Sequence, residues 1–448
     1  MKAFKTYDIR GIYGVDIDQK LAFKIGYAFV CIIAKKKILV GYDARMYSKE
    51  LLDAFSLGAK LGGAIIYNVG LTTTPALHYL QIKNRLSSGV MVTASHNPAE
   101  YHGFKFFDES GGSISYHKGL KDIEIFIQNN QIKVPERFPV LPVTYNNRVS
   151  EYINFITKNV SSPGSKLKIV IDVSNGSAGE VVRAVVEKID IDVVILNSNP
   201  DGTFPVHSPN PLDFKSHKLV ASEVQNNNAH LGALLDGDGD RVIFFDEKGR
   251  LIESNFSSSL IALALLNRYP KSVIVHDLIA SRVFSEIILQ AGGLPVSSRI
   301  GYTFLYDKMR EHKAVFGSET SGHLYFRVND NFYTESAIYG IFILLNYLIE
   351  KNKPISKLIE PLRSRYFQQQ EVNIDIKNIN VDEILCKISS AYSSTKQDKI
   401  DGLSIYGDTA WFNIRPSNTE PLLRLTVEAV NKQVADKTTN LILSLINS

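Results

Sequence analysis

The sequence predicts an α/β protein with four domains, in which three similar mixed-sheet α/β domains and a C-terminal α+β domain surround a central cleft. Three observations lead to this prediction. The 448 residues suffice for about three domains at roughly 150 residues each. Short runs rich in valine and isoleucine alternate with amphipathic stretches, which is typical of α/β layers. The C-terminal part instead reads as strand, helix, hairpin, strand and helix. The four domains are expected at residues 1–142, 143–246, 247–360 and 361–448.

The first domain shows the alternation most clearly. The segment "KKILVGYDAR" (36–45) predicts a strand and a loop, and an amphipathic helix follows it. The segment "AIIYNVGLTTTPALHYLQI" (64–82) predicts another strand, a turn and a helix. A hydrophobic run that stops at Thr93 and an aromatic run at 104–107 predict two further strands.

The later domains repeat parts of this rhythm. The segment "KLKIVIDVSNGSAGEVVRAVVEK" (166–188) predicts a strand, a turn with glycine and a helix. In the third domain, "SVIVHD" (272–277) predicts a strand, and a long apolar helix is expected near 335–351. In the fourth domain, "DGLSIYGDTAWFNIRPS" (401–417) predicts a hairpin, and the C-terminus predicts a helix. We expect a linker between Pro354 and Pro361.

Composition and charge exclude several classes of protein. The net charge is only +4 and no face of the chain is obviously basic, so we expect no nucleic acid partner. The lysine-free apolar runs are too short to span a bilayer, so we expect no membrane partner. Cys31 and Cys386 each lie in an apolar stretch and are expected to be buried. These features favour a cytoplasmic protein and leave a monomer or a homodimer open.

Ser95 lies where a hydrophobic strand ends, in the window "VTASHNPAEYHGFKFF" (92–107). Its hydroxyl can project at the carboxyl end of the strand, where open α/β sheets bind ligands. A simple turn explains the same residues, because serine, asparagine and proline are common turn formers. The hydrolase motif G-x-S-x-G is absent, since Thr93 and Asn97 occupy the two glycine positions. The residues alone leave the turn and the functional serine open.

Three aspartates alternate with glycines in "DGDGDR" (236–241). Glycine lets the backbone fold tightly enough for Asp236, Asp238 and Asp240 to face one hard cation, and without a cation they would repel one another. A calcium EF-hand is a poor match, because its sixth position requires glycine and is Arg241 here, and both flanks read as strands. We therefore predict a Mg²⁺ site that leaves positions for a phosphate oxygen.

Two further loops concentrate polar side chains. The loop "GSETSGH" (317–323) presents three groups suited to sugar hydroxyls, namely Glu319, Ser321 and His323. The loop "RPSNTEPLLR" (415–424) presents four donors suited to a phosphate dianion, namely Arg415, Ser417, Asn418 and Thr419. A polar loop without a role explains the first equally well, and a turn with a surface arginine explains the second.

Taken together, the four motifs resemble those of the α-D-phosphohexomutases, a family that includes phosphomannomutase/phosphoglucomutase and phosphoglucosamine mutase. "TASHNP" is similar to the family's phosphoserine loop, "DGDGDR" to its metal loop, "GSETSGH" to its sugar-binding loop and "RPSNTEP" to its phosphate-binding loop, in the family's order. "YDIRG" (7–11), "FPVHSPNPL" (204–212) and "IGYTFLYDKMRE" (300–311) extend the resemblance over the whole chain.

The resemblance implies reversible transfer of phosphate between the 1- and 6-positions of a mannose or glucose phosphate. Ser95 would carry the phosphoryl group, and a hexose 1,6-bisphosphate would be the intermediate and activator. Mg²⁺ would be held by Asp236, Asp238, Asp240 and a phosphate oxygen on Ser95. The catalytic residues would be Ser95, Lys105, Arg10 and His323. The hexose phosphate would contact Tyr7, Arg241, Gly301, Tyr302, Glu319, Ser321, His323, Arg415, Ser417, Asn418 and Thr419.

Three positions depart from the family pattern. His102 stands where asparagine is common, Tyr302 where histidine is common, and Ile279 where some members have a basic residue. Phosphoglucosamine mutase is the alternative within the family, although that branch usually has glutamine at the position of Thr320. A Mg²⁺-dependent sugar phosphatase and a sugar-phosphate sensor are alternatives from other classes.

Overall fold

The structure is a computed structural model that describes eight stretches of the chain. They are residues 1–33, 36–145, 148–160, 167–189, 191–329, 332–376, 380–417 and 422–447. The chain divides into two compact units. The first unit comprises Met1–Ser257 and Ser321–Ser356, and the second comprises Ser258–Thr320 and Lys357–Ser448.

The first domain contains a five-stranded mixed sheet. Its order is β1 (Ile9–Ile12), β5 (Tyr101–Phe107), β4 (Ser88–Val92), β2 (Lys37–Tyr42) and β3 (Ile65–Leu71). Strand β2 is parallel to β3 and β4, whereas β5 is antiparallel to β1 and β4. Helices pack around this sheet, namely α1 (Gln19–Ile32), α2 (Ser48–Leu61), α3 (Thr74–Lys83) and α4 (Leu120–Asn129).

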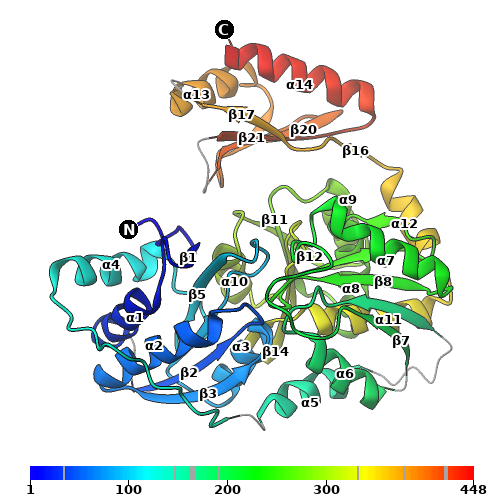
Figure 1. Ribbon diagram of the computed structural model, residues 1–448. Coiled ribbons are helices and arrows are strands. Elements are labelled where there is room, and N and C mark those ends of the chain that lie inside the picture. Colours follow the sequence, from blue (N-terminus) through cyan, green and yellow to red (C-terminus); the bar gives the residue numbers. More distant parts are fainter. Residues whose placement is uncertain are drawn as a thin grey trace. The chain divides into compact units, whose positions relative to one another are not determined.

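Helices α1 and α2 lie side by side (Figure 1) because two glycines let their backbones approach. A Cβ on Gly26 would come within 2.0 Å of the carbonyl oxygen of Phe55, and a Cβ on Gly58 within 2.0 Å of that of Phe23. Any larger residue at either position would push the helices apart. Beneath them, Phe55 and Phe106 belong to one buried core cluster.

The second domain repeats the mixed sheet. Its order is β10 (Leu251–Ile252), β9 (Val242–Phe245), β8 (Leu231–Leu235), β6 (Lys168–Asp172) and β7 (Asp192–Leu196). Strand β6 is parallel to β7 and β8, and β9 turns back antiparallel to β8. Its helices are α5 (Val149–Asn159), α6 (Gly179–Ile189) and α7 (Phe214–Asn226). The return from β8 to β9 holds the acidic loop.

The third domain contains strands of both directions. Strand β11 (Val273–Asp277) is parallel to β12 (Leu294–Ser298) and β13 (Phe316–Ser318). Strands β14 (Leu324–Asn329) and β15 (Phe332–Glu335) form an antiparallel hairpin. The helices are α8 (Ser254–Arg268), α9 (Arg282–Gln290), α10 (Tyr302–Glu311), α11 (Ala337–Lys351) and α12 (Ile355–Arg363).

The C-terminal domain is an antiparallel sheet with two helices. Its order is β16 (Phe367–Gln368), β21 (Leu422–Ala429), β20 (Ala410–Pro416), β19 (Leu403–Tyr406) and β18 (Lys396–Asp398), with β17 (Val372–Asp375) also paired to β21. The helices are α13 (Val381–Ala391) and α14 (Lys432–Asn447). Three mixed-sheet α/β domains and a fourth sheet domain with helices are thus confirmed, whereas the predicted domain boundaries stay a prediction.

One smaller prediction is wrong and another needs refinement. Cys31 and Cys386 are exposed, because helical periodicity turns them away from the buried faces of α1 and α13. The segment between Pro354 and Pro361 does contain a boundary between the two units, at Ser356 and Lys357, but it is helical, since α12 covers most of it. Within the described part of the chain, no helix is long and apolar enough to cross a membrane.

Candidate active site

Ser95 lies in the turn between β4 and β5 and has a left-handed backbone, with φ at +50°. Its amide donates to Oγ1 of Thr93 at 2.8 Å, and its own hydroxyl donates to Oδ2 of Asp236 at 2.8 Å. The turn geometry agrees with the sequence. Ser95 is only 1% exposed, because the acidic loop of the second domain covers it.

The acidic loop between β8 and β9 brings three carboxylates together. One oxygen each of Asp236, Asp238 and Asp240 lies within 4.8 Å of the others, and all three residues are buried. Gly237 lets the loop touch the serine turn, because a Cβ there would come within 2.8 Å of the carbonyl oxygen of Ser95. The flanking elements are strands, as the sequence predicted, and not the helices of an EF-hand.

The charge state of this loop fits a divalent cation. Burial, followed by Asp240 and Asp238, raises the pKa of Asp236 well above its usual range. Among the described residues, Oδ1 of Asp238 and Oδ1 of Asp240 are buried without a hydrogen-bond partner. Buried carboxylate oxygens without a partner are costly. A cation held by three carboxylates would satisfy them, and carboxylate oxygens are the ligands that Mg²⁺ prefers.

Lys105 projects from β5 into the same cluster. Its ammonium lies 2.7 Å from Oδ2 of Asp238 and 2.5 Å from Oδ2 of Asp240. Burial alone would lower the pKa of Lys105, but Asp238 and Asp240 outweigh it and raise that pKa well above the usual value. The side chain is therefore an ammonium at neutral pH. Conversely, Lys105, His323 and Arg241 outweigh burial and hold the pKa of Asp240 well below its usual range.

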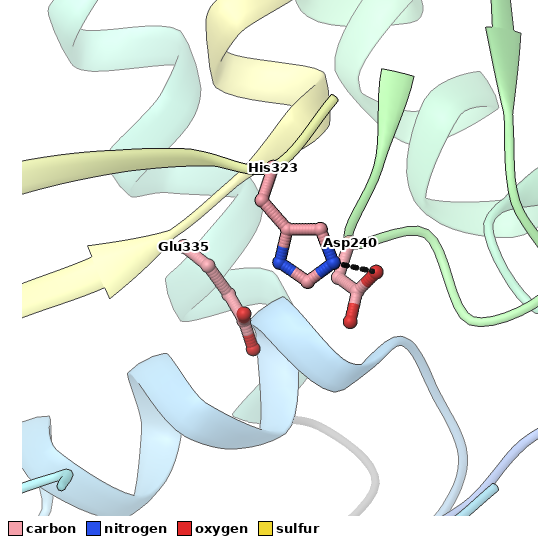
Figure 2. Close-up of side chains that lie close together, drawn as sticks. All are labelled: Asp240, His323 and Glu335. Atoms are coloured by element: carbon pink, nitrogen blue, oxygen red, sulfur yellow. Dashed lines mark ion pairs between the residues drawn. The ribbon is translucent and has the colours of Figure 1, made fainter. Parts of the chain in front are cut away.

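His323 lies at the start of the β14–β15 hairpin and contacts the acidic loop. Figure 2 shows its imidazole between the carboxylates of Asp240 and Glu335, and one donor atom of each residue lies within 4.8 Å of the others. Nε of Arg241 donates to Nε2 of His323 at 2.6 Å, so Nδ1 carries the ring proton, 2.9 Å from the hydroxyl of Tyr325. Burial lowers the pKa of His323 to about 3, so the ring is neutral at pH 7.

The N-terminal motif reaches the serine turn through Arg10. Its Nη1 donates to Oδ1 of Asn97 at 2.7 Å, and its Nη2 pairs with Asp8. Tyr7 is half-buried on the same segment. In the first unit, the structure therefore brings together Ser95, Asp236, Asp238, Asp240, Lys105, Arg241 and His323, with Arg10 joined to the serine turn through Asn97.

The sugar loop (317–323) is divided between the units: Glu319 belongs to the second unit and is buried, whereas Ser321 belongs to the first. Oε1 of Glu319 accepts from the amide of Gly301 at 3.2 Å, and Tyr302 starts helix α10 directly afterwards. Gly301 has φ at +125°, a conformation that strongly favours glycine. Ser321, two residues after Glu319 on the same loop, is half-buried.

Arg415 lies near the end of β20 and is buried. Its Nη2 donates to Oε2 of Glu371 at 2.7 Å, and its Nη1 donates to Oδ1 of Asn413 at 3.2 Å. Arg424 bonds the other oxygen of Glu371 at 3.0 Å. Ser417 follows as a half-buried residue, whereas Asn418 and Thr419 lie outside the described residues.

Sequence reasoning missed three side chains of these clusters. The hydroxyl of Thr74, at the start of α3, donates to Oδ2 of Asp238 at 2.5 Å. Glu335 adds a carboxylate beside His323, and Glu371 holds the two arginines of the C-terminal domain. Only Thr74 had a local signal, as a polar residue at a strand-to-helix turn.

Three carboxylates suited to a divalent cation lie beside a hydroxyl and several fixed positive charges. Such sites serve metal-assisted phosphoryl transfer, and the fold and this arrangement place the protein in that class of enzyme.

Comparison with known proteins gives the family. Four profiles of the phosphoglucomutase/phosphomannomutase family match in order: alpha/beta/alpha domain I at residues 1–133, domain II at 150–249, domain III at 253–366 and the C-terminal domain at 371–443. The chain therefore belongs to the phosphoglucomutase/phosphomannomutase family and is an intramolecular phosphotransferase of the phosphohexomutase type.

Individual relatives agree with this assignment. A phosphomannomutase of Methanocaldococcus jannaschii is 36% identical over 447 residues, which cover 100% of this chain and 98% of the relative. Phosphohexose mutases of Xanthomonas campestris are 32% identical over 431 residues, which cover 96% and 95%. The crystal structure of a phosphoglucomutase/phosphomannomutase family protein of Burkholderia thailandensis has a TM-score of 0.87 and 26% identity, and the match covers 99% of this chain and 96% of that one.

Proposed function

We propose that the protein interconverts the 1- and 6-phosphates of a hexose through a phosphoserine at Ser95 and a hexose 1,6-bisphosphate. The observation that carries this proposal is the hydrogen bond of 2.8 Å between Oγ of Ser95 and Oδ2 of Asp236. It directs a buried serine hydroxyl at the three-carboxylate loop. A phosphoryl group on this oxygen would then lie beside ligands for a cation and beside fixed positive charges, which is what phosphoryl transfer requires.

The cation would be Mg²⁺, held by Asp236, Asp238, Asp240 and a phosphate oxygen on Ser95. When bound, it supplies charge compensation for the transferring phosphoryl group. Arg241 adds a fixed positive charge from the protein, 3.9 Å from Asp240. Lys105 adds a second, since its ammonium already contacts two of the carboxylates.

The sugar hydroxyl that attacks phosphoserine must lose a proton, and the released serine oxygen must gain one. His323 is the one of the three candidates that is neutral at pH 7, and its Nε2 can accept a proton once Arg241 no longer donates to it. Lys105 is an ammonium, which suits it to donate a proton and not to accept one. Arg10 is a guanidinium and stays protonated in proteins. We therefore assign His323 as acceptor and Lys105 as donor in the forward direction.

The remaining groups would hold the substrate. Glu319 and Ser321 would bind sugar hydroxyls, with Gly301 and Tyr302 beside them. The phosphate that does not react would be held by Arg415, Ser417, Asn418 and Thr419, and Tyr7 and Arg241 would complete the contacts. Because one phosphate anchor serves two orientations of the sugar, the same serine exchanges phosphate with either end of the bisphosphate.

Mannose and glucose phosphates are the proposed substrates. The relative that is 36% identical is named a phosphomannomutase, which supports mannose. Thr320 supports the same branch, because amino-sugar mutases usually have glutamine there. Its hydroxyl donates to Oδ2 of Asp277 at 2.8 Å, so the side chain is engaged within the protein.

The mass of the intact protein tests the phosphoserine. Incubation with glucose 1,6-bisphosphate should add one phosphate, located at Ser95 by peptide mapping, and Ser95→Ala should gain none. A wild-type protein that turns over substrate without phosphate at Ser95 would rule out the proposal.

Coupled assays with mannose 1-phosphate, glucose 1-phosphate and glucosamine 6-phosphate test the substrate. We expect turnover of the first two. A clear preference for the amino sugar would assign the protein to the phosphoglucosamine branch instead. Release of inorganic phosphate without isomerised sugar would indicate a phosphatase.

A further inference from the structure

Arg45 occupies a buried position beneath the serine turn. It follows β2 in the segment "GYDAR", and its side chain is 0% exposed. Its Nε pairs with Oδ2 of Asp43 at 3.2 Å. An arginine this deeply buried needs partners for all five of its N–H groups.

All the remaining donors of Arg45 go to backbone carbonyls of one short segment, the turn that carries the serine. Nη2 donates to the carbonyl of Ser95 at 2.7 Å and to that of Asn97 at 2.5 Å. Nη1 donates to the carbonyl of Pro98 at 2.6 Å and to that of Tyr101 at 2.9 Å. A single planar guanidinium therefore fixes the course of the backbone from Ser95 to the start of β5.

The partner of Arg45 holds the serine from its other side. Oδ2 of Asp43 accepts from the hydroxyl of Thr93 at 2.7 Å, and Oγ1 of Thr93 accepts from the amide of Ser95 at 2.8 Å. The pair of Arg45 and Asp43 thus fixes both the carbonyl and the amide of Ser95. The φ of Ser95 is +50°, which is unfavourable for a residue other than glycine. Such a conformation persists only when neighbouring groups constrain it, and these hydrogen bonds to the carbonyl and the amide of Ser95 provide that constraint.

A loop of the second domain packs against the guanidinium of Arg45. The ring of Phe204 lies 5.0 Å from Cζ of Arg45, a cation–π distance. Gly202, on the same loop, allows this approach, since a Cβ there would come within 2.6 Å of Cα of Arg45. The loop that carries "FPVHSPNPL" therefore helps to position the serine turn through Arg45.

We propose that Arg45 is a positioning residue for phosphoryl transfer to and from Ser95, acting through Asp43 and supported by Phe204. It holds the turn so that Oγ of Ser95 faces the carboxylate loop, where that oxygen contacts Asp236. The guanidinium N–H groups of Arg45 are used by Asp43 and by these four carbonyls, so Arg45 contacts Ser95 at its backbone and does not donate to the three aspartates or to the groups assigned to the sugar. Its loss should therefore lower the rate of transfer and leave substrate affinity intact. This inference rests on the proposed phosphoserine.

Arg45→Lys tests the role, because lysine keeps the charge beside Asp43 but cannot reach four carbonyls at once. We expect kcat to fall about 100-fold, the effect of a misplacement near 1 Å, while KM for the hexose phosphate stays within about threefold. Phosphorylation of Ser95 by glucose 1,6-bisphosphate should slow to the same extent in the mass measurement. Arg183→Lys is the matched control, since Nη2 of Arg183 donates to the carbonyl of Ser198 at 2.7 Å away from the turn, and its kcat should stay at the wild-type value.

Phe204→Leu serves as a second variant that leaves every charge in place, so the test remains decisive if Arg45→Lys does not fold. Its kcat should fall roughly threefold with KM unchanged. Folded Arg45→Lys with wild-type kcat, a change confined to KM, or an unchanged Phe204→Leu would each overturn the inference. If any of these results were obtained while the wild-type enzyme carried phosphate at Ser95, the proposed function would still be supported and only the role of Arg45 would be rejected. Wild-type turnover without phosphate at Ser95 would overturn both.

Discussion

The ammonium of Lys105 lies 2.7 Å from Oδ2 of Asp238, a carboxylate that we assign to the cation. It lies 2.5 Å from Oδ2 of Asp240 as well, so one side chain engages two of the three carboxylates. Lys105 is buried, and a buried ammonium is stable only because the acids surround it. The lysine and the cation thus neutralise the same negative charge.

This relationship predicts opposite effects of Lys105→Met on stability and on metal affinity. Removing one partner of a buried ion pair should lower the stability of the metal-free protein by about 3 kcal/mol. Because the ammonium no longer competes for Asp238 and Asp240, Mg²⁺ should bind more tightly and raise the melting temperature by more than in the wild type. Titration of Mg²⁺ followed by thermal unfolding measures both effects.

The control for this prediction is Lys49→Met. Lys49 pairs with Asp53 at 2.9 Å, but its side chain is 42% exposed, so its loss should change stability by less than about 1 kcal/mol. Weaker Mg²⁺ binding in Lys105→Met would show that the lysine helps to hold the cation and does not compete with it.

Ser95 allows catalysis and backbone strain to be separated. Ser95→Ala and Ser95→Gly both lose the hydroxyl that we assign to the phosphoryl group, so both should lose turnover. They should differ in stability, because φ at Ser95 is +50° and glycine adopts that value at little cost. We expect Ser95→Gly to be more stable than Ser95→Ala by about 1 kcal/mol in urea unfolding.

Ser174 is the matched control, since its φ is +55°. Its glycine variant should likewise be more stable than its alanine variant, with turnover still measurable in both. If Ser95→Ala were the more stable of the two Ser95 variants, the backbone of Ser95 would not be held in the left-handed region.

The extent to which sequence alone predicts this site depends on how local each signal is. The alternation of glycine and aspartate in "DGDGDR" predicts a tight acidic loop, and Asp236, Asp238 and Asp240 do cluster. By contrast, nothing in the sequence near Ser95 predicts that its hydroxyl donates a hydrogen bond to Asp236, 141 positions away. Nor does it predict that the serine turn is buried. These features depend on contacts between domains of the first unit, which no local pattern encodes.

The ionisation of Lys105 could not be predicted either, for the same reason. From the motif alone, a lysine near a phosphoserine is a candidate base, and the sequence left it equal to His323 and Arg10. Its ammonium is fixed by Asp238 and Asp240, which come from another domain. Predictions of the folding pattern succeeded because the signal lies within one segment, as in the short apolar run of β11 and the long apolar run of α11.

His323 and His207 predict pH dependence of opposite sign. Burial lowers the pKa of His323 to about 3, below the ordinary value near 6.5. The unfolded chain therefore takes up a proton before the folded one does, and stability falls as pH drops from about 6.5 toward 3. His207 differs, because its hydrogen bond to Asp172 outweighs burial and raises its pKa. The protonated His207 therefore stabilises the folded protein below pH 6.5, and this stabilisation is lost as the pH rises through the raised pKa of His207.

Urea unfolding between pH 4.5 and 9 in the absence of metal checks both signs. His323→Gln should lose less stability than the wild type on the acid side. His207→Gln should lose less than the wild type on the alkaline side. The two variants act as controls for each other, because general acid or alkaline effects would shift both in the same direction. A steeper acid loss in His323→Gln would contradict a neutral imidazole in the folded protein.

Arg415→Lys tests the phosphate anchor. Glu371 orients the guanidinium of Arg415 at 2.7 Å, and lysine keeps the charge but loses the planar, two-pronged geometry that suits a phosphate. The anchor would hold the phosphate that does not react, so it should contribute equally before and during transfer. Loss of such uniform binding raises KM and spares kcat. We expect KM to rise about tenfold, with kcat within about threefold.

Arg424→Lys is the control for the anchor, because Arg424 bonds the other oxygen of Glu371 but is not one of the assigned anchor residues. Its KM should stay within about twofold of the wild type. Steady-state kinetics with glucose 1-phosphate, at saturating glucose 1,6-bisphosphate, separates the two parameters. If kcat fell in Arg415→Lys while KM stayed constant, Arg415 would act on the reacting phosphoryl group. One anchor could then not serve both orientations of the sugar, and the exchange would need a different explanation.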